Sequence, residues 1–250
     1  MVGDAAVVAI VPARGGSKGI PRKNVREVAG HPLIAYSIAA GLASPLVDRV
    51  IVSTDDPEIA DISRAYGADV PFMRPAALAG DDTPDYPVFV HALDWLARHE
   101  NQHPDVVVHL RPTSPLRQVT DLDRAIELLQ TDPRASAVRA VCEPFQNPYK
   151  MWRIRDDGVL TPLIQGEFAE PYNQPHQKLP PVYWQTGYID VIRRTTLVER
   201  GSMTGDCILP LVLDADSWID IDTPAALDYA DFLLRTGRAS VAMPRRSSRP

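Results

Sequence analysis

The sequence predicts an α/β protein built on an open, mostly parallel sheet. Short, apolar, β-branched runs alternate with helical patterns over the first 130 residues. These runs are apolar at consecutive positions, which is typical of strands covered by helices on both faces. With 45% hydrophobic residues in 250, the chain has enough apolar material for one large core. We therefore expect a single domain over residues 1–236, with ligands bound beyond the carboxyl ends of the strands.

The expected elements follow each other in a regular order. Apolar runs predict strands at 6–11, 49–54, 68–72, 106–110, 188–192 and 208–213, and helical spacing predicts helices at 32–43, 57–66, 84–99, 119–130 and 224–235. Asp56 before Pro57 is an N-cap signal for the second helix, and Gly67 is placed to end it.

Residues 144–181 interrupt this pattern. The segment holds seven prolines, several aromatic residues and the turn Asp156-Asp157-Gly158, so we expect an inserted arm of short strands and loop. In a chain of this size such an arm could join a dimer. The polar, arginine-containing end, 237–250, is expected to be a disordered tail.

Composition excludes several classes of protein. The 26 Lys and Arg against 32 Asp and Glu give a net charge of −6, which is unsuited to binding along a nucleic acid. Cys142 and Cys207 are too few for a disulfide framework or a zinc site and indicate a reducing compartment. No apolar run approaches the roughly 20 residues that span a bilayer, and no secretion signal is evident, so we expect a cytoplasmic protein without a membrane partner.

The loop after the first expected strand has the composition of a polyphosphate site. Between Pro12 and Asn24 it carries three glycines, which allow close approach of the backbone, and four cations, Arg14, Lys18, Arg22 and Lys23. Arg and Lys neutralise the charge that grows on a leaving phosphate. The spacing is neither that of a P-loop nor that of a GxGxxG dinucleotide turn. The alternative is a basic surface loop without a ligand.

A pair of carboxylates precedes the last expected helix. Asp220 and Asp222 stand at i and i+2 on an extended segment, so both side chains point to the same side. Hard oxygen ligands in this arrangement suit Mg²⁺, which keeps several waters and bridges to substrate phosphate. The alternative is that Asp222 only caps the helix begun by Thr223-Pro224.

Five segments in this order resemble the CMP-N-acylneuraminate synthetases. They are the basic loop, Ser53-Thr54-Asp55-Asp56, the run from Arg74 to Ala79, the turn from Arg111 to Arg117, and Asp220-Ile221-Asp222, and the similarity extends over about residues 6–235. The resemblance implies a nucleotide-diphospho-sugar transferase-type fold and a homodimer joined by the inserted arm. It also implies transfer of a nucleoside monophosphate from CTP to a sugar with release of pyrophosphate.

The resemblance also implies roles for individual residues. Arg14 and Lys23 would hold the triphosphate with help from Lys18, Asp220 and Asp222 would carry Mg²⁺, and Arg74 would frame base and ribose. Lys150 corresponds to an arm lysine that approaches the sugar acid of the neighbouring subunit. The implied nucleotide-binding set is Ala13, Arg14, Gly15, Gly16, Ser17, Lys18, Lys23, Asn24, Arg74, Ala79 and Asp81.

The acceptor side departs from the family pattern. Arg111 stands where sialate-activating members have Gln, and two family arginines are replaced by His176 and Trp184. We expect the acceptor to contact Arg111, Lys150, Gln185, Thr186, Gly187 and Tyr188. Because Arg can bind an anion with two hydrogen bonds, the exchange leaves open a second activity, that of a sugar-1-phosphate guanylyl- or cytidylyltransferase. Alternatively, Lys178 or Arg111 supplies the missing charge for a sugar acid.

A protein that only binds nucleotide is a third hypothesis. It is disfavoured because both phosphate cations and both carboxylates are present, and an idle site would be free to lose them.

Overall fold

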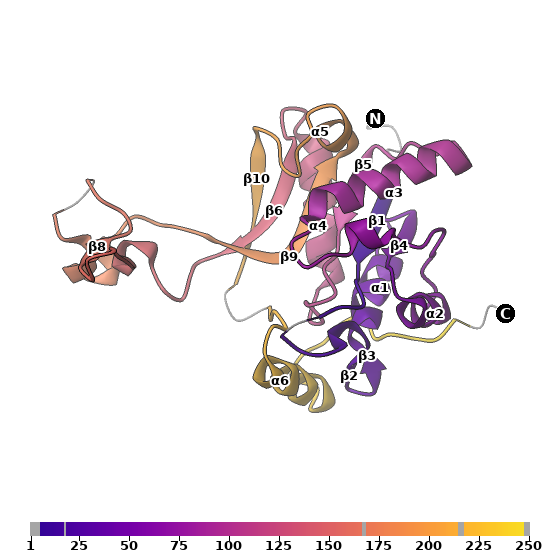
Figure 1. The fold of residues 1–250 in the computed structure, drawn as a ribbon, viewed down its shortest axis with the longest axis horizontal. Coiled ribbons are helices and arrows are strands. Elements are labelled where there is room, and N and C mark those ends of the chain that lie inside the picture. Colours follow the sequence, from indigo (N-terminus) through magenta and orange to yellow (C-terminus); the bar gives the residue numbers. More distant parts are fainter. Residues whose placement is uncertain (1–5, 18, 167–168, 215–217, 248–250) are drawn as a thin grey trace.

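The computed structural model describes residues 6–17, 19–166, 169–214 and 218–247. In this part of the chain the main sheet has six strands in the order β10-β6-β9-β5-β1-β4 (Figure 1). The strands are β1 Val7–Pro12, β4 Arg49–Ser53, β5 Val106–His109, β6 Ala137–Cys142, β9 Trp184–Arg193 and β10 Ile208–Leu213. Only β9 runs antiparallel to its neighbours in this sheet, so the predicted mostly parallel α/β fold is confirmed.

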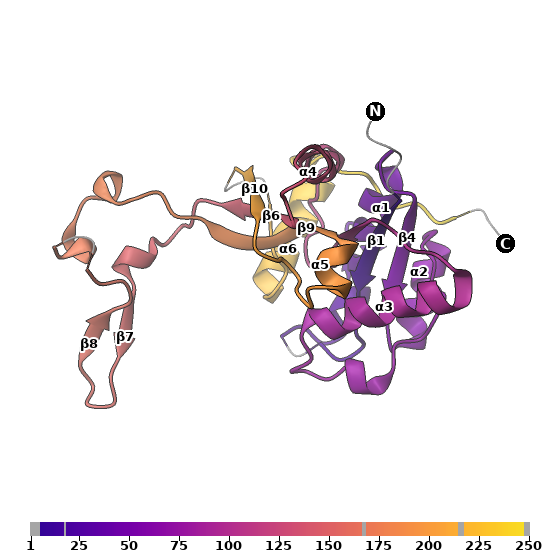
Figure 2. The ribbon, with the colours of Figure 1, turned by 90° about the horizontal axis from the view of Figure 1, so that it is seen from above.

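Helices cover both faces of the sheet (Figure 2). The helices are α1 Leu33–Ala43, α2 Pro57–Ala65, α3 Asp85–Glu100, α4 Val119–Thr131, α5 Arg194–Val198 and α6 Pro224–Arg235. Side chains of α1, α2 and α4 share one apolar core with the sheet, and those of α3 and α5 share a second core on the opposite face. Burial on both faces is the reason that the central strands are apolar throughout.

Three adjacent strands, β6, β9 and β5, bring polar side chains to the face of the sheet that α3 covers. His109 of β5 pairs with Asp190 of β9, which pairs in turn with Arg139 of β6. The neighbours of these polar residues, two positions away on the same face of each strand, belong to the core under α3 and α5. They are Val107 of β5, Ile192 of β9 and Ala137 of β6. Because alternate residues of a strand share a face, a polar row continues the apolar core toward the ends of the strands.

Two small differences from the predicted elements have simple causes. Residues 68–72 form only a single bridge, Ile51 to Asp69, because Pro71 has no N–H with which to extend a ladder. No strand was predicted for β6, in which Arg139 interrupts a short apolar run. A hairpin of β2 (Glu27–Val28) and β3 (His31–Pro32) follows the basic loop and packs with α6.

The inserted arm projects from the body of the molecule (Figures 1 and 2). It contains the short 3₁₀ helices η3 Pro148–Lys150, η4 Pro171–Asn173 and η5 His176–Lys178, and the antiparallel strands β7 Trp152–Ile154 and β8 Leu160–Pro162. Gly158, with a φ of 81°, closes the hairpin. Short strands and loop are what the composition of 144–181 predicts.

The expectation of disorder from residue 237 is wrong for the described residues 237–247. Val241 packs beside the α6 core, the backbone N–H of Ser247 donates to the carbonyl of Ala65 at 2.7 Å, and Gln118 Nε2 donates to the carbonyl of Ser240 at 2.9 Å. The apolar residues Val241 and Met243 among the arginines provide the packing that a wholly polar tail would lack. Among the described residues, no helix combines the length and apolar character needed to cross a membrane.

Candidate active site

A cavity of about 400 Å³ opens beyond the carboxyl ends of β1 and β5. Three segments line it: the basic loop after β1, residues 74–88, and the turn 111–113 that follows β5. The cavity therefore lies where ligands bind in open α/β sheets. It brings together Arg14, Ser17, Lys23, Asn24, Arg74, Asp81 and Arg111 of the residues predicted from sequence.

The glycine loop is fixed to the start of α2. The N–H of Gly15 donates to Asp55 Oδ1 at 3.0 Å, and a Cβ at Gly15 would lie only 2.7 Å from Asp56 Oδ2. Arg22 pairs with Asp56 at 3.3 Å and also with Glu58. Asp56 in turn caps α2 by accepting from Glu58 N at 2.9 Å and Ile59 N at 3.2 Å. One of the four loop cations, Arg22, therefore positions the loop instead of lining the cavity.

Arg14 and Lys23 lie on the cavity wall with acidic or carbonyl partners. Arg14 donates to the carbonyl of Gly80 at 2.7 Å and pairs with Asp81 at 3.0 Å. Lys23 Nζ donates to the carbonyl of Ile221 at 2.8 Å and to Asp222 Oδ1 at 2.9 Å. Both cations thus have partners that a polyphosphate can replace. Lys18 lies outside the described residues.

Asp220 and Asp222 suit a divalent cation. Oδ1 of Asp220 is buried and has no hydrogen-bond partner in the described part of the chain. Burial raises the pKa of Asp220, and the nearby Asp222 charge raises it further. A bound cation would relieve this unfavourable burial of charge. The cap of α6 is Thr223, whose side chain accepts from Ala226 N at 3.2 Å, so capping by Asp222 is wrong.

No cluster of three or more His, Cys, Asp or Glu among the described residues could hold a metal by itself. Further ligands of an ion at Asp220 and Asp222 would have to be water or substrate phosphate, which is the usual situation for Mg²⁺.

Of the remaining residues predicted to bind nucleotide, some line the cavity and others do not. Arg74 is buried, donates from Nε to Ser53 Oγ at 3.1 Å and lines the cavity; burial lowers its pKa to about 10. Asn24 lines the cavity, but its Nδ2 donates to the carbonyl of Arg14 at 3.0 Å and so braces the loop. Ala13 is buried, with its N–H on the carbonyl of Ser53 at 2.9 Å. Gly15, Gly16 and Ala79 do not line the cavity, whereas Gly80 does.

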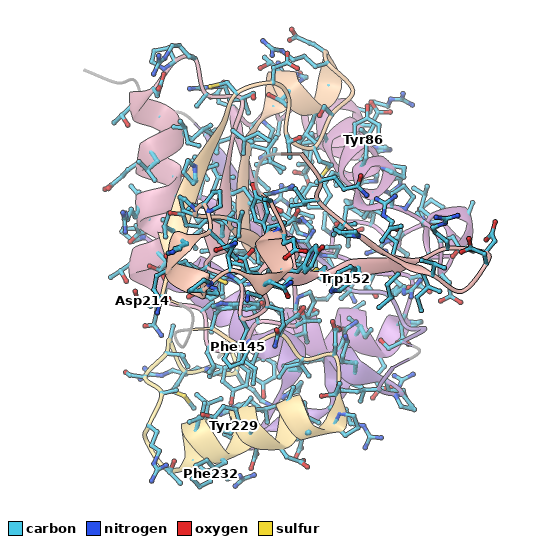
Figure 3. All side chains as sticks on the ribbon, turned by 90° about the vertical axis from the view of Figure 1, so that its left-hand side faces the viewer. Tyr86, Phe145, Trp152, Asp214, Tyr229 and Phe232 are labelled. Carbon is cyan, nitrogen blue, oxygen red and sulfur yellow. The ribbon has the colours of Figure 1, made fainter. Side chains whose placement is uncertain are left out.

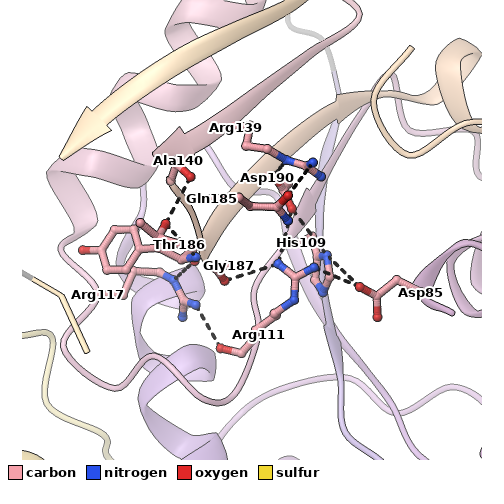
Figure 4. Close-up of polar contacts among 11 residues, drawn as sticks. Asp85, His109, Arg111, Arg117, Arg139, Ala140, Gln185, Thr186, Gly187 and Asp190 are labelled. Atoms are coloured by element: carbon pink, nitrogen blue, oxygen red, sulfur yellow. Dashed lines mark hydrogen bonds and ion pairs between the residues drawn. The ribbon is translucent and has the colours of Figure 1, made fainter. Parts of the chain in front are cut away.

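Arg111 reaches the cavity from the turn after β5 and is held by two carboxylates (Figure 4). Its NH2 donates to Asp85 Oδ2 at 2.9 Å, and its NH1 donates to Asp190 Oδ2 at 3.3 Å and the carbonyl of Gly187 at 3.4 Å. Arg139 donates from Nε to the other oxygen of Asp190 at 2.6 Å. Asp85, Asp190 and Arg139 were not predicted from the sequence, in which the available signal was an acidic residue inside the apolar run Tyr188 to Ile192.

The predicted acceptor roles of Thr186 and Tyr188 are wrong within this chain. Tyr188 is 1% exposed in the α1–α4 core, where its hydroxyl binds Asp121 at 3.1 Å, and the buried Thr186 donates to the carbonyl of Ala140 at 3.1 Å. Gly187, at a φ of 69°, lies where the β6–β9 register shifts. The irregularity puts Tyr188 on the opposite face from Asp190, although simple alternation would place them together.

The other two predicted acceptor residues outside the cavity also have partners in the chain. Gln185 accepts from Arg139 NH1 at 2.9 Å. Lys150 lies in the arm, where its Nζ donates to the carbonyl of Gln174 at 2.8 Å, and it does not line the cavity of its own chain.

Comparisons with known proteins agree with this geometry. The cytidylyltransferase family model matches residues 8–151. The chain is 34% identical to the CMP-N,N'-diacetyllegionaminic acid synthase of Legionella pneumophila, over 90% of this chain and 93% of that protein. It is 31% identical to the N-acylneuraminate cytidylyltransferase of Escherichia coli, over 91% of this chain and 51% of that protein.

A solved structure of similar fold is a CMP:2-keto-3-deoxy-manno-octonic acid synthetase complexed with CTP, with a TM-score of 0.69 and 18% identity over 93% of this chain and all of that one. The family model covers more than half of the chain, and the Legionella relative is similar over nearly its full length. The chain therefore belongs to the cytidylyltransferase family and is an enzyme of the acylneuraminate cytidylyltransferase type.

Proposed function

We propose that this enzyme transfers CMP from CTP to a hydroxyl group of a free nonulosonic acid, with Mg²⁺ as the metal ion. The observation that supports this proposal is that Arg14 and Lys23 line one cavity and that Lys23 pairs with Asp222 of the predicted carboxylate pair. The sugar class follows from relatives named as synthases of CMP-diacetyllegionaminic acid and as an N-acylneuraminate cytidylyltransferase.

The reaction is a displacement at the α-phosphorus. The acceptor oxygen forms a bond to that phosphorus, the bond to the bridging oxygen of the β-phosphate breaks, and pyrophosphate leaves with the electron pair. The hydroxyl proton passes to water or buffer. The protein contributes mainly position and charge neutralisation, as is usual for transfer of phosphorus groups.

Lys23 and Arg14 supply the positive charge for the leaving pyrophosphate. Lys23 pairs with Asp222 and Arg14 with Asp81, and both cations line the cavity. A triphosphate carries more negative charge than either carboxylate and would replace these partners. Asn24 and Asp55 hold the loop backbone, which leaves the long cationic side chains as its adaptable part.

Asp220 and Asp222 would hold the Mg²⁺. When bound, the ion would neutralise charge on the phosphate oxygens. Its binding would also take Asp222 from Lys23, and so free the Lys23 ammonium for phosphate.

No observation favours the alternative of a sugar 1-phosphate acceptor. Arg111, the residue that suggests it, is already paired with Asp85 and Asp190.

The proposal is tested by pyrophosphate release with Mg²⁺, in which CTP, GTP, UTP and ATP are each combined with N-acetylneuraminate, with N,N'-diacetyllegionaminate or with a sugar 1-phosphate. We expect turnover with CTP and a free sugar acid. Turnover only with a sugar 1-phosphate, or only with another nucleotide, would contradict it.

We also propose that the enzyme is a cytoplasmic homodimer joined by the arm. Several apolar side chains of the arm are largely uncovered within one chain: Ile154 is 76% and Phe145 95% exposed. Figure 3 views the molecule from the side of the arm, with Phe145, Tyr229 and Phe232 along this side. A second copy would bury such a surface. The free thiols of Cys142 and Cys207 agree with a reducing compartment.

A further inference from the structure

Arg111 belongs to a cluster of charged side chains at the edge of the cavity (Figure 4). Asp190 lies at its centre and is only 2% exposed. It accepts from Arg139 Nε on one oxygen and from Arg111 NH1 on the other. Asp85, at the first turn of α3, pairs with Arg111 NH2 from the cavity side. Two guanidinium groups therefore face two carboxylates.

The buried His109 adds no charge to this cluster. Its Nδ1 lies 4.0 Å from Asp85 Oδ2 and 3.9 Å from Asp190 Oδ2, and neither ring nitrogen has a hydrogen-bond partner among the described residues. Burial lowers the pKa of His109 well below its usual value, and the charge of Arg111 lowers it further. The imidazole is therefore neutral near pH 7, and the two arginines and two aspartates sum to zero net charge.

Little of the Arg111 guanidinium remains for an anion. Such a group has five N–H donors, and three of them donate to Asp85, Asp190 and the carbonyl of Gly187. A phosphate bound at Arg111 would also lie beside the carboxylate of Asp85, which would repel it. The arrangement opposes the two-point binding of phosphate that an isolated arginine favours.

Asp85 offers a hydrogen-bond acceptor beside the donors of Arg111. Its side chain is 41% exposed and lines the cavity, and in the described part of the chain its Oδ1 makes no hydrogen bond, while Oδ2 is held by Arg111. A carboxylate oxygen accepts from hydroxyl or amide N–H donors. The surface beside Arg111 therefore offers two kinds of hydrogen-bonding group. Asp85 accepts, and the N–H groups of Arg111 that have no partner among the described residues donate, while the charge of Arg111 is balanced by the carboxylates.

We propose that Asp85 determines acceptor specificity: by compensating Arg111 it makes this subsite select an uncharged, hydroxyl- or acylamino-bearing part of the sugar and reject a phosphorylated acceptor. Asp190, with Arg139, is a positioning residue that holds Arg111 in this state. The inference rests on the proposed function and refines it. A sugar carboxylate must then be bound by cations elsewhere, such as those of the arm.

The test is calorimetric titration of glucose 1-phosphate into enzyme saturated with CTP without Mg²⁺, a state in which the loop cations are occupied and turnover cannot occur. The variants are Asp85→Asn, the double variant Asp85→Asn with Arg111→Gln, and Asp94→Asn as a matched control. Asp94 lies on the same helix, half-exposed and paired with Arg98 at 2.7 Å, away from the cavity. Asp85→Asn keeps the shape of the side chain and removes its charge.

We expect Asp85→Asn to bind glucose 1-phosphate at least about tenfold more tightly than the wild type, because one carboxylate beside Arg111 is gone. The double variant should lose this gain, and Asp94→Asn should match the wild type. In turnover, Asp85→Asn should raise KM for the sugar acid more than KM for CTP.

Binding by the wild type as tight as that of Asp85→Asn would overturn the inference, and so would a gain that persists without Arg111. A wild type that binds no CTP in a separate titration with Mg²⁺ and no acceptor would overturn the proposed function, and this refinement with it. The two titrations therefore distinguish the two failures.

Discussion

Two cations of this site are paired with carboxylates that substrate phosphate is expected to replace. Lys23 is paired with Asp222, so the cation expected to hold phosphate and a carboxylate expected to hold Mg²⁺ neutralise each other. This arrangement avoids leaving two unpaired charges at the cavity. It also means that metal and nucleotide should help each other to bind, because each removes the partner that the other must displace.

Lys23→Ala should lower kcat/KM for CTP by about 100-fold, since preorganised charge at a phosphate typically contributes this much. The measurement is pyrophosphate release at varied CTP, and Arg98→Ala, which removes an exposed cation of α3, serves as the charge-matched control. Equal rates for wild type and Lys23→Ala would exclude Lys23 from triphosphate binding.

His109 should make stability depend on pH. Folded His109 stays neutral because its pKa is lowered by burial, whereas unfolded His109 takes up a proton below about pH 6.5. The unfolded state therefore binds more protons in acid, so stability is full above pH 6.5 and falls as the pH decreases. Between pH 7.5 and 5.5 the free energy of unfolding should fall by about 1.4 kcal/mol from this effect.

Urea unfolding of wild type and His109→Leu across this pH range measures the effect. His91, whose pKa is also lowered by burial, contributes equally to both proteins and cancels in the comparison. The same pH dependence in both proteins would contradict the assignment to His109.

Among the elements, α2 serves the site without contributing to the cavity wall. Its N-cap, Asp56, also pairs with Arg22 of the basic loop, and the preceding Asp55 holds Gly15. The position of the glycine loop is thus coupled to the start of a helix that packs firmly in the core. Strand β9 acts similarly, since Asp190 in its regular part and the carbonyl of Gly187 at its irregularity both accept from Arg111.

Replacing Asp56 separates capping from loop positioning. Asp56→Ala should lower the free energy of unfolding by about 1 kcal/mol, whereas Asp56→Asn should keep most of the cap. Both remove the charge that holds Arg22, so both should raise KM for CTP. Urea midpoints and CTP kinetics check this, with Asp61→Ala, at an exposed position of α2, as the control. A wild-type KM in both variants would show that the Arg22 contact does not position the loop.

At the level of the whole molecule, the projecting arm has exposed apolar side chains that nothing in its own chain covers among the described residues. It carries Lys150 away from the cavity of its own subunit. If the proposed dimer places Lys150 at the partner's acceptor, inactive homodimers of Lys150→Ala and of Asp222→Ala should complement each other after mixing and subunit exchange. Half of the dimers would be mixed, each with one intact site, so we expect about a quarter of the wild-type rate.

No recovery of activity would mean that Lys150 and Asp222 act within the same chain. Sedimentation checks that dimers form, and copurification of one variant with an affinity-tagged copy of the other checks that subunits exchange.

Local sequence patterns were enough to predict the α/β fold, most of its elements and the basic loop that lines the cavity. Apolar periodicity follows from burial on both faces of a sheet, and glycines with cations after a strand are local signals. Asp220 and Asp222 could be predicted as a pair for the same reason, because their spacing is local, and their role as metal ligands stays a prediction.

The partners of these residues depend on how the chain folds and could not be predicted from local patterns. Asp85, Asp190 and Arg139 come from α3, β9 and β6, and no local pattern shows that they meet Arg111. Tyr188 was misplaced because a strand irregularity changes which side chains face the cavity, and alternation alone cannot reveal it. Charge compensation depends on distances between segments far apart in the chain, and the fold alone sets those distances.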